Sequence, residues 1–161
     1  MRTSITTLLF LALAAACGGK SAADLQKEAR AALDAGDAAR AIEVVEEALG
    51  QDAVRHDAPA AWRLEQIRLD ALAASGKGAL IKSSLDRLGA TYPTQANAAL
   101  YRALADRVKG ADVPGAIEIL TAGDQRFPAD HTSFAEAIDA LKANAVLPPD
   151  QVEKLKALGY L

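Results

Sequence analysis

Few residues of this 161-residue sequence are of types that do chemistry. His56 and His131 are its two imidazole side chains, and no cysteine pair or spaced set of carboxylates accompanies either of them. A metal site needs such a cluster, and acid–base catalysis needs a positioned partner, so we interpret both histidines as ordinary loop residues. The G-x-S-x-G pattern of many serine hydrolases does not occur. The sequence therefore predicts no catalytic residue, no metal ligand and no cofactor.

Cys17 is the single cysteine, and it ends an N-terminal segment of distinct composition. Arg2 gives this segment a positive start, and residues 5–16 form an uncharged run that is too short to cross a bilayer as a helix. Small residues then lead into Cys17. The segment resembles the signal peptide and lipobox of bacterial lipoproteins. The resemblance implies a signal peptide over 1–16, lipid attached to Cys17 and a tether over 17–21.

Lipidation of Cys17 would fix where the protein works. In the lipoprotein family the cysteine carries two or three acyl chains, which makes attachment to the membrane effectively permanent. Gly18 follows the cysteine, where an Asp favours retention at the inner membrane, so the resemblance implies an outer-membrane protein facing the periplasm. The alternative is an incidental thiol beside an ordinary signal-peptidase site at residues 14–16.

The composition favours an all-α body. Alanine and leucine dominate and aromatic residues make up only 4% of the chain, a mixture that supports helices better than strands. The formal net charge is -3, and the charges are spread along the chain without a basic stripe. Binding to nucleic acid, which depends on neutralising phosphates, is therefore not expected.

Apolar residues recur at helical spacing from Ala22 onward, and glycine-containing breaks divide them into hairpins. Breaks at Gly36, at 76–78 and at Gly110 each separate two predicted helices, and the second and third breaks lie about 34 residues apart. The stretch 51–59 is predicted as an irregular connection. A further helix is predicted from the capping-box spacing of Ser133 and Glu136, and an amphipathic helix follows Pro148-Pro149.

This spacing resembles the tetratricopeptide repeat (TPR) family over 22–128. In the first unit, Ala29, Ala41 and Ala48 stand where the family has small residues, and Gly36 stands at the turn. The resemblance implies antiparallel helix hairpins stacked as a short right-handed solenoid. We expect a TPR-like domain over 22–145 and a C-terminal capping helix over 146–161, whose charges give the last unit a polar outer face.

A solenoid of this kind has a concave face, lined by the first helix of each hairpin, that holds a peptide segment or a partner helix. The same polar residues would serve equally well to solvate that face. Trp62 either seals the junction between the first two hairpins or stands in the groove as an anchor. The predicted groove residues are Gln26, Arg30, Arg63, Gln66, Asp70, Asn97 and Tyr101.

The sequence thus predicts a non-enzymatic, membrane-anchored protein-interaction scaffold or adaptor for an unidentified envelope protein. A second hypothesis makes the chain an accessory subunit of an envelope enzyme, or a weak hydrolase of unknown substrate. That hypothesis would be favoured by His131 lying within hydrogen-bond reach of Ser133 and of an acid in a closed pocket. A third hypothesis is a stable monomer whose groove binds nothing tightly.

Overall fold

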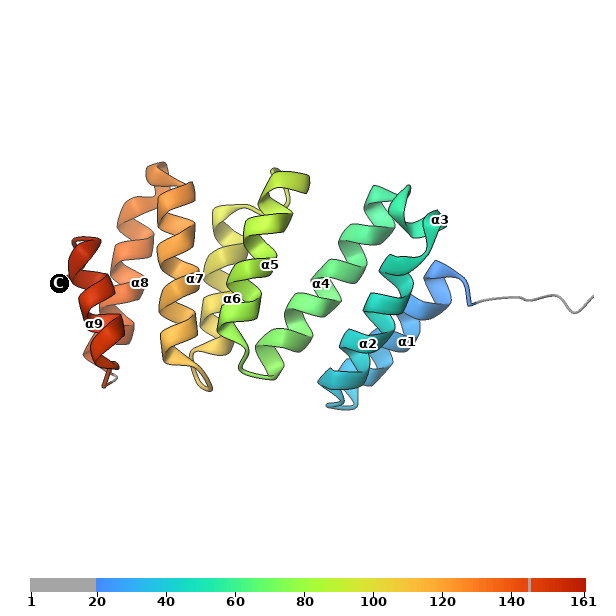
Figure 1. Ribbon diagram of the computed structural model, residues 1–161, viewed down its shortest axis with the longest axis horizontal. Coiled ribbons are helices and arrows are strands. Elements are labelled where there is room, and N and C mark those ends of the chain that lie inside the picture. The colour runs from blue at the N-terminus through green and yellow to red at the C-terminus, as the bar shows by residue number, and fades with distance from the viewer. Residues whose placement is uncertain (1–19, 145) are drawn as a thin grey trace, which may run out of the picture.

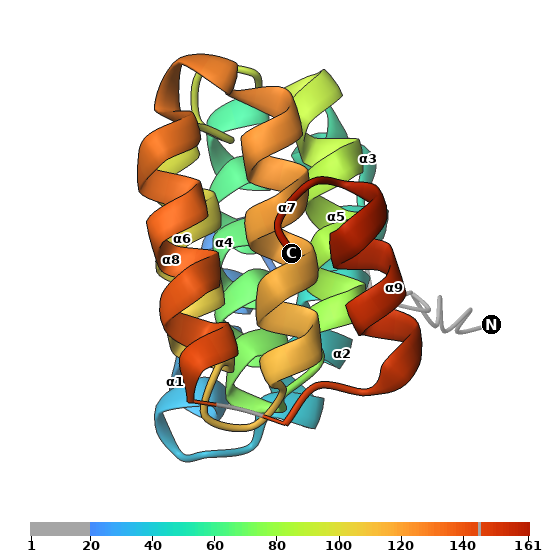
Figure 2. The same ribbon diagram turned by 90° about the vertical axis from the view of Figure 1, so that its left-hand side faces the viewer.

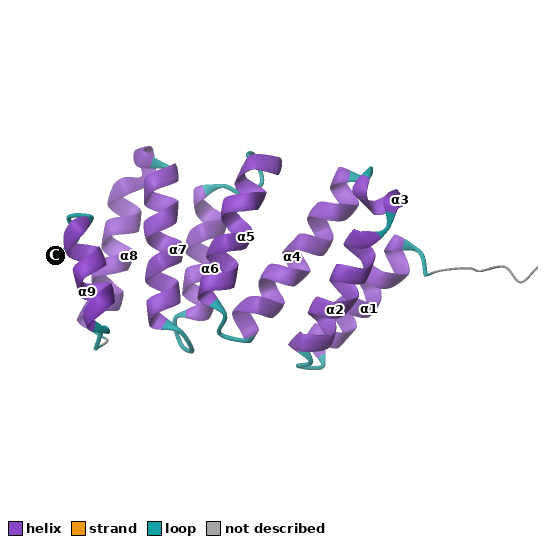
Figure 3. Cartoon of the chain, viewed as in Figure 1, coloured by secondary structure: helices purple, strands orange, loops and turns teal. Residues whose placement is uncertain are grey.

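The computed structural model describes residues 20–144 and 146–161, and this part of the chain is all-helical (Figure 3). The signal peptide and Cys17 lie outside the described residues. Within the described part, no helix combines the length and the apolar character needed to span a bilayer. The helices are α1 (Ala22–Asp34), α2 (Ala38–Gly50), α3 (Asp52–Arg55), α4 (Ala58–Ala74), α5 (Gly78–Thr91), α6 (Ala98–Val108), α7 (Val113–Arg126), α8 (His131–Ala143) and α9 (Pro149–Ala157), with a 3-10 turn at Pro128–Asp130 before α8.

The long helices stand side by side and run alternately up and down in an elongated stack (Figure 1). Viewed from its C-terminal end, the stack has two layers (Figure 2). Helices α1, α4, α6 and α8 form one layer, and α2, α5, α7 and α9 form the other. Each layer therefore takes one helix from each successive pair.

Local sequence signals explain where most helices begin. Ser21 forms a capping box with Asp24 at α1, and Asp37, Asp57 and Asn97 cap α2, α4 and α6 through their side chains. Each of these side chains accepts a hydrogen bond from a backbone N–H that has no partner inside the helix. The starts of these four helices are explained by this one interaction.

Two sequence-based expectations about local structure were wrong. The connection predicted as irregular contains the short helix α3. Helix α8 begins at His131, directly after the 3-10 turn, so Ser133 lies inside its first turn and is not an N-cap. The break predicted at Gly110 is present between α6 and α7, and this turn has one more residue than the turns at Gly36 and Gly76.

Apolar side chains form two core clusters that meet at α4. Leu64 and Ile67 belong to the cluster built with α1, α2 and α3, whereas Leu69 and Leu72 belong to the larger cluster that continues to α9. A 17-residue helix is long enough to contribute to both. Helix α4 therefore contributes side chains to the cores of both halves of the stack.

Candidate functional site

Side chains from three helices converge on one surface of the first layer, which we call the α1–α4–α6 face. Arg63 on α4 donates through Nε to Oε1 of Gln26 on α1, at 3.3 Å. One turn further along α1 and two turns further along α4, Arg30 Nη1 lies 3.4 Å from Oδ2 of Asp70. Four of the predicted groove residues are therefore brought together in two cross-helix pairs.

A hollow of about 170 Å³ opens between these helices. Gln66, a fifth predicted residue, is exposed and lines it together with Arg30 and Asp70. Buried Leu69 and Leu104 supply apolar lining, and half-buried Leu100 adds to it. The hollow thus combines an apolar floor with charged groups.

Arg107 on α6 is the member of this group that sequence reasoning missed. Its Nη1 pairs with Oδ1 of Asp70, so that one carboxylate lies between the guanidinium groups of Arg30 and Arg107. The side chains of Arg30, Asp70 and Arg107 are 47%, 27% and 56% exposed. Arg107 follows Leu104, which lines the hollow, by three positions on α6, but spacing along one helix does not connect it with Asp70 on another.

Tyr101 does not belong to this face, contrary to the prediction. It is only 1% exposed, and its ring edge packs against Phe127 at 5.6 Å between centroids. Its hydroxyl donates to the backbone oxygen of Leu85, and burial raises the pKa of Tyr101 above its ordinary value. The reason is helical phase, because Tyr101 lies on the inward stripe of α6 with Ala98, Ala105 and Val108.

Asn97 and Trp62 have their own local partners. Asn97 is exposed and acts as the N-cap of α6, where its side chain accepts from the backbone N–H of Leu100 at 3.1 Å. Trp62 is partly buried against the larger core cluster, with its ring centroid 5.2 Å from that of Tyr92. Of the two interpretations of Trp62, the contact with Tyr92 favours the seal over the groove anchor.

The two histidines differ in their surroundings. His56 is exposed, and its Nδ1 lies 2.8 Å from the backbone oxygen of Asp52. His131 Nδ1 lies 2.9 Å from both carboxylate oxygens of Asp124, which also accepts a hydrogen bond from the hydroxyl of Tyr160. Across the described ranges, no group of three or more His, Cys, Asp or Glu side chains is arranged to hold a metal ion.

The Asp124–His131 pair supplies part of what the hydrolase hypothesis asks for. Asp124 is buried, but its remaining hydrogen bond goes to Tyr160 in the C-terminal segment, and Ser133 is exposed. The arrangement holds the C-terminal segment against α7, and among the described residues the hydrogen bonds of the His131 ring go to Asp124 and not to Ser133. It therefore adds no support for hydrolysis.

Glu65 is a buried acid that sequence reasoning did not single out. Its side chain is 4% exposed and lies 2.7 Å from Arg87 on α5 and 3.5 Å from Arg68. The three residues line a hollow of about 470 Å³ together with Tyr92. Because a buried carboxylate is costly without cations, the two arginines stabilise Glu65 and the cluster joins α4 to α5, while Oε2 of Glu65 has no hydrogen-bond partner among the described residues.

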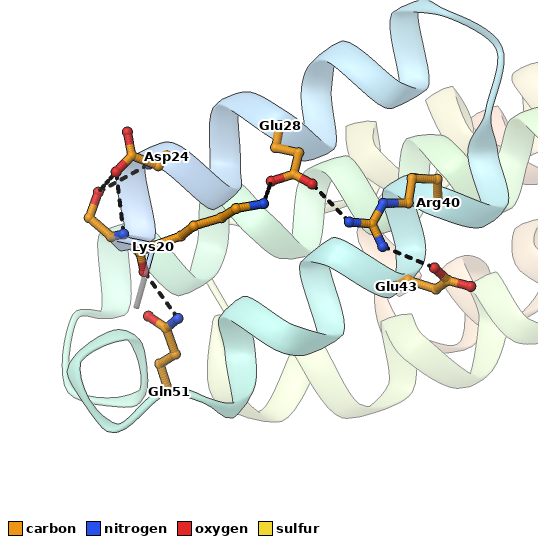
Figure 4. Close-up of polar contacts among 7 residues, drawn as sticks. Lys20, Asp24, Glu28, Arg40, Glu43 and Gln51 are labelled. Atoms are coloured by element: carbon orange, nitrogen blue, oxygen red, sulfur yellow. Dashed lines mark hydrogen bonds and ion pairs between the residues drawn. The ribbon is translucent and has the colours of Figure 1, made fainter. Parts of the chain in front are cut away.

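The chain is fixed to the body from Lys20 onward (Figure 4). The backbone oxygen of Lys20 accepts from Gln51 Nε2 at 3.2 Å, and its ammonium group pairs with Glu28. Arg40 bridges Glu28, at 2.8 Å, and Glu43, at 3.2 Å. Hydrogen bonds from Lys20 and Arg40 hold the pKa of Glu28 below its ordinary value. The predicted lipidation residue is thus three positions from an anchored residue.

Comparison with known proteins adds no relative to this description. No protein-family model, no curated protein and no solved structure matches the chain. The functional argument therefore depends on the geometry of the α1–α4–α6 face and on the N-terminal sequence.

Proposed function

We propose that the protein is a lipid-anchored adaptor of the bacterial cell envelope, held in the outer membrane through Cys17 and facing the periplasm. It would dock another envelope protein without performing chemistry. The observation that carries the proposal is the α1–α4–α6 face, where polar residues from three helices surround one hollow with an apolar floor. Exposed polar groups around a hollow with an apolar floor are typical of a surface that recognises a protein segment.

The helices form, in this proposal, a short right-handed solenoid of TPR-like units closed by α9. The first two hairpins support it because their turns are equivalent. Gly36 and Gly76 both have positive φ, and the residue after each donates to a carbonyl five positions back, Asp37 to Ala32 and Lys77 to Leu72. Helices that repeat one turn geometry stack with a constant offset, which is how a solenoid keeps one layer facing a ligand.

The tether would keep the body close to the membrane. Three residues at full extension span about 11 Å, so lipid on Cys17 would hold Lys20 within that distance of the lipid headgroups. Lys20 is itself fixed to α1 through Glu28 and, through Gln51, to the residue between α2 and α3. The N-terminal end of the stack would therefore lie at the membrane surface, and the partner would be a protein found at that surface.

Fractionation of cells tests the anchor. The Cys17→Ser variant is expected to move from the membrane to the soluble fraction while keeping the thermal midpoint of the wild type, because the change lies outside the packed helices. Retention of the variant in the membrane fraction would contradict the lipid anchor.

Site-specific photo-crosslinking in the native host tests the adaptor role. A crosslinking residue is placed at Gln66, which lines the hollow, and a matched one at Ala90, which is exposed on α5 in the other layer. We expect one reproducible envelope protein to be captured from position 66 and not from position 90. Equal capture from both positions, or none from position 66, would overturn the role assigned to this face.

A further inference from the structure

We infer that the partner presents an acidic segment to the α1–α4–α6 face, with a carboxylate that takes the place of Asp70 between Arg30 and Arg107. The inference rests on the proposed function, since it names the chemistry of the partner for the same face. It is carried by the charge of the face, the geometry around Asp70 and the shape of the hollow.

The charge of the face is opposite in sign to that of the whole chain. The chain has 21 acidic and 18 basic residues. On this face, however, Lys27, Arg30, Arg63 and Arg107 are exposed basic side chains, whereas Asp34 and half-buried Asp70 are the acids beside them. A local excess of positive charge on an acidic protein attracts an acidic partner and orients its approach.

Asp70 occupies the position that a ligand carboxylate would take. Its two oxygens face two different guanidinium groups, Arg30 on α1 and Arg107 on α6. Each guanidinium has five N–H donors, so neither is saturated by its single contact with Asp70. Both arginines are about half exposed, and exposed ion pairs of this kind contribute little stability. An incoming carboxylate can therefore take over these donors at small cost.

The shape of the hollow favours a protein segment over a lipid surface. A space of about 170 Å³ holds one side chain and does not fit a flat array of headgroups. Buried Leu69 and Leu104, with Leu100, provide apolar contact below the arginines. An acidic side chain with an aliphatic stem, or an acid next to an aliphatic residue, satisfies both parts of the hollow.

Titration of the purified protein with a fluorescently labelled oligoglutamate peptide tests the inference. We expect the Arg30→Gln/Arg107→Gln variant to bind about tenfold more weakly or worse, because it loses two charge-assisted contacts. The Asp70→Asn variant is expected to bind several-fold more tightly, because it removes the competing carboxylate. The matched control is Arg55→Gln/Lys156→Gln, which removes the same charge away from the face and is expected to bind like the wild type.

Two further probes separate the sources of binding. An oligolysine peptide of equal length is expected not to bind, although the net charge of the chain alone would attract it. Vesicles of phosphatidylglycerol test the lipid alternative. The inference would be overturned if the wild type binds the vesicles but not oligoglutamate, and the Arg30→Gln/Arg107→Gln variant loses the binding to vesicles. Unchanged affinity of the Arg30→Gln/Arg107→Gln variant, or weaker binding by Asp70→Asn, would overturn it as well.

The outcome can be distinguished from a failure of the proposed function. Capture of an envelope protein from position 66, together with no binding of oligoglutamate, would retain the adaptor and reject the acidic partner. Absence of capture from position 66 would reject the adaptor itself, whatever the peptide does. Circular dichroism of each variant verifies that the exposed substitutions leave the helices intact.

Discussion

At the scale of single residues, Asp112 shows how one carboxylate can serve two helices. Its Oδ1 accepts from the backbone N–H of Gly115 at 2.8 Å and caps α7, while its Oδ2 accepts from the backbone N–H of Gly78 at 3.0 Å at the start of α5. The residue before α5, Lys77, provides no side-chain cap. Asp112 therefore supplies through space the cap that the local sequence of α5 lacks, and its negative charge lies at two helix N-termini.

Replacement of Asp112 by Ala is expected to destabilise the protein by about 2 kcal/mol, because two caps are lost at once. The matched comparison is Asp37→Ala, which removes the single hydrogen bond to Arg40 N at the start of α2 and is expected to cost about 1 kcal/mol. Urea unfolding of both variants measures the difference. Equal losses of unfolding free energy would mean that the contact with Gly78 contributes nothing.

Tyr160 is one of the residues that make the stability of the fold sensitive to high pH. Burial, followed by the hydrogen bond to Asp124, raises the pKa of the Tyr160 hydroxyl above its ordinary value of 10.0. Folding therefore favours the neutral phenol of Tyr160. The stability that this neutral hydroxyl contributes is fully present below pH 10 and is lost as the pH rises above that value.

We expect wild type to be more stable than Tyr160→Phe by about 1.5 kcal/mol near pH 8, because the variant loses a hydrogen bond to a charged group. The difference should shrink as the pH approaches about 11. Urea unfolding of the two proteins over this pH range measures it, and titrations shared by both proteins cancel in the comparison. A difference that stays constant with pH would show that the hydroxyl is not protected by folding.

At the scale of elements, α5 and α7 approach each other most closely at two glycines, Gly78 and Gly115. A Cβ added to Gly115 would lie 2.7 Å from the Cα of Gly78 and 2.2 Å from Oδ2 of Asp112. Such distances cannot be accommodated by moving a flexible side chain, because one of the neighbours is backbone. The close approach is what lets Asp112 reach both helices, so the glycine pair and the shared cap form one junction.

Gly115→Ala is accordingly expected to cost about 1–3 kcal/mol of unfolding free energy, through a forced shift of α5 against α7. Gly110→Ala is the control, since a Cβ at that position meets no atom within 4 Å and its φ is not positive. Thermal unfolding of the two variants provides the measurement. A midpoint for Gly115→Ala equal to that of Gly110→Ala would contradict the close crossing.

At the scale of the whole molecule, α4 couples the two core clusters. Leu64 on α4 is fully buried among residues of α1 and α2, while Leu69 on the same helix belongs to the larger cluster and lies beside Leu104 of α6. Because the helix is continuous through both clusters, loss of either one exposes part of its surface. The two halves of the stack should therefore unfold together.

Leu64→Ala is expected to destabilise the protein by about 2–5 kcal/mol and to leave a single transition. Trp62, the only tryptophan, lies against Tyr92 and reports on the junction between the halves by fluorescence. Its transition should coincide with the loss of helix followed by circular dichroism. A fluorescence transition that precedes the loss of helix would mean that the N-terminal half unfolds independently.

The sequence by itself determined most of the secondary structure and the composition of the core. Apolar periodicity acts within one or two turns, so it can be recognised along the chain. Caps act within three residues, yet Asn97, which the structure shows as the N-cap of α6, was predicted as a groove residue. Prediction from the sequence was wrong at two places where a single helical turn matters. The stretch 51–59 contains the short helix α3, and α8 begins at His131, before the predicted cap Ser133. Prediction was also wrong at Tyr101, where the helical phase of α6 decides which residues face inward.

Only the tertiary structure decided which polar groups meet. The bond between Asp112 and Gly78, the pair of Arg107 with Asp70 and the pair of Arg87 with Glu65 each join residues on different helices. Side-chain type and local spacing do not specify such pairs, because they depend on the offset and rotation with which the helices pack. Most polar residues of the α1–α4–α6 face could be named from the sequence, because helical spacing places them on one side of each helix. The position of Asp70 between two arginines depends on how three helices pack, so only the tertiary structure shows it.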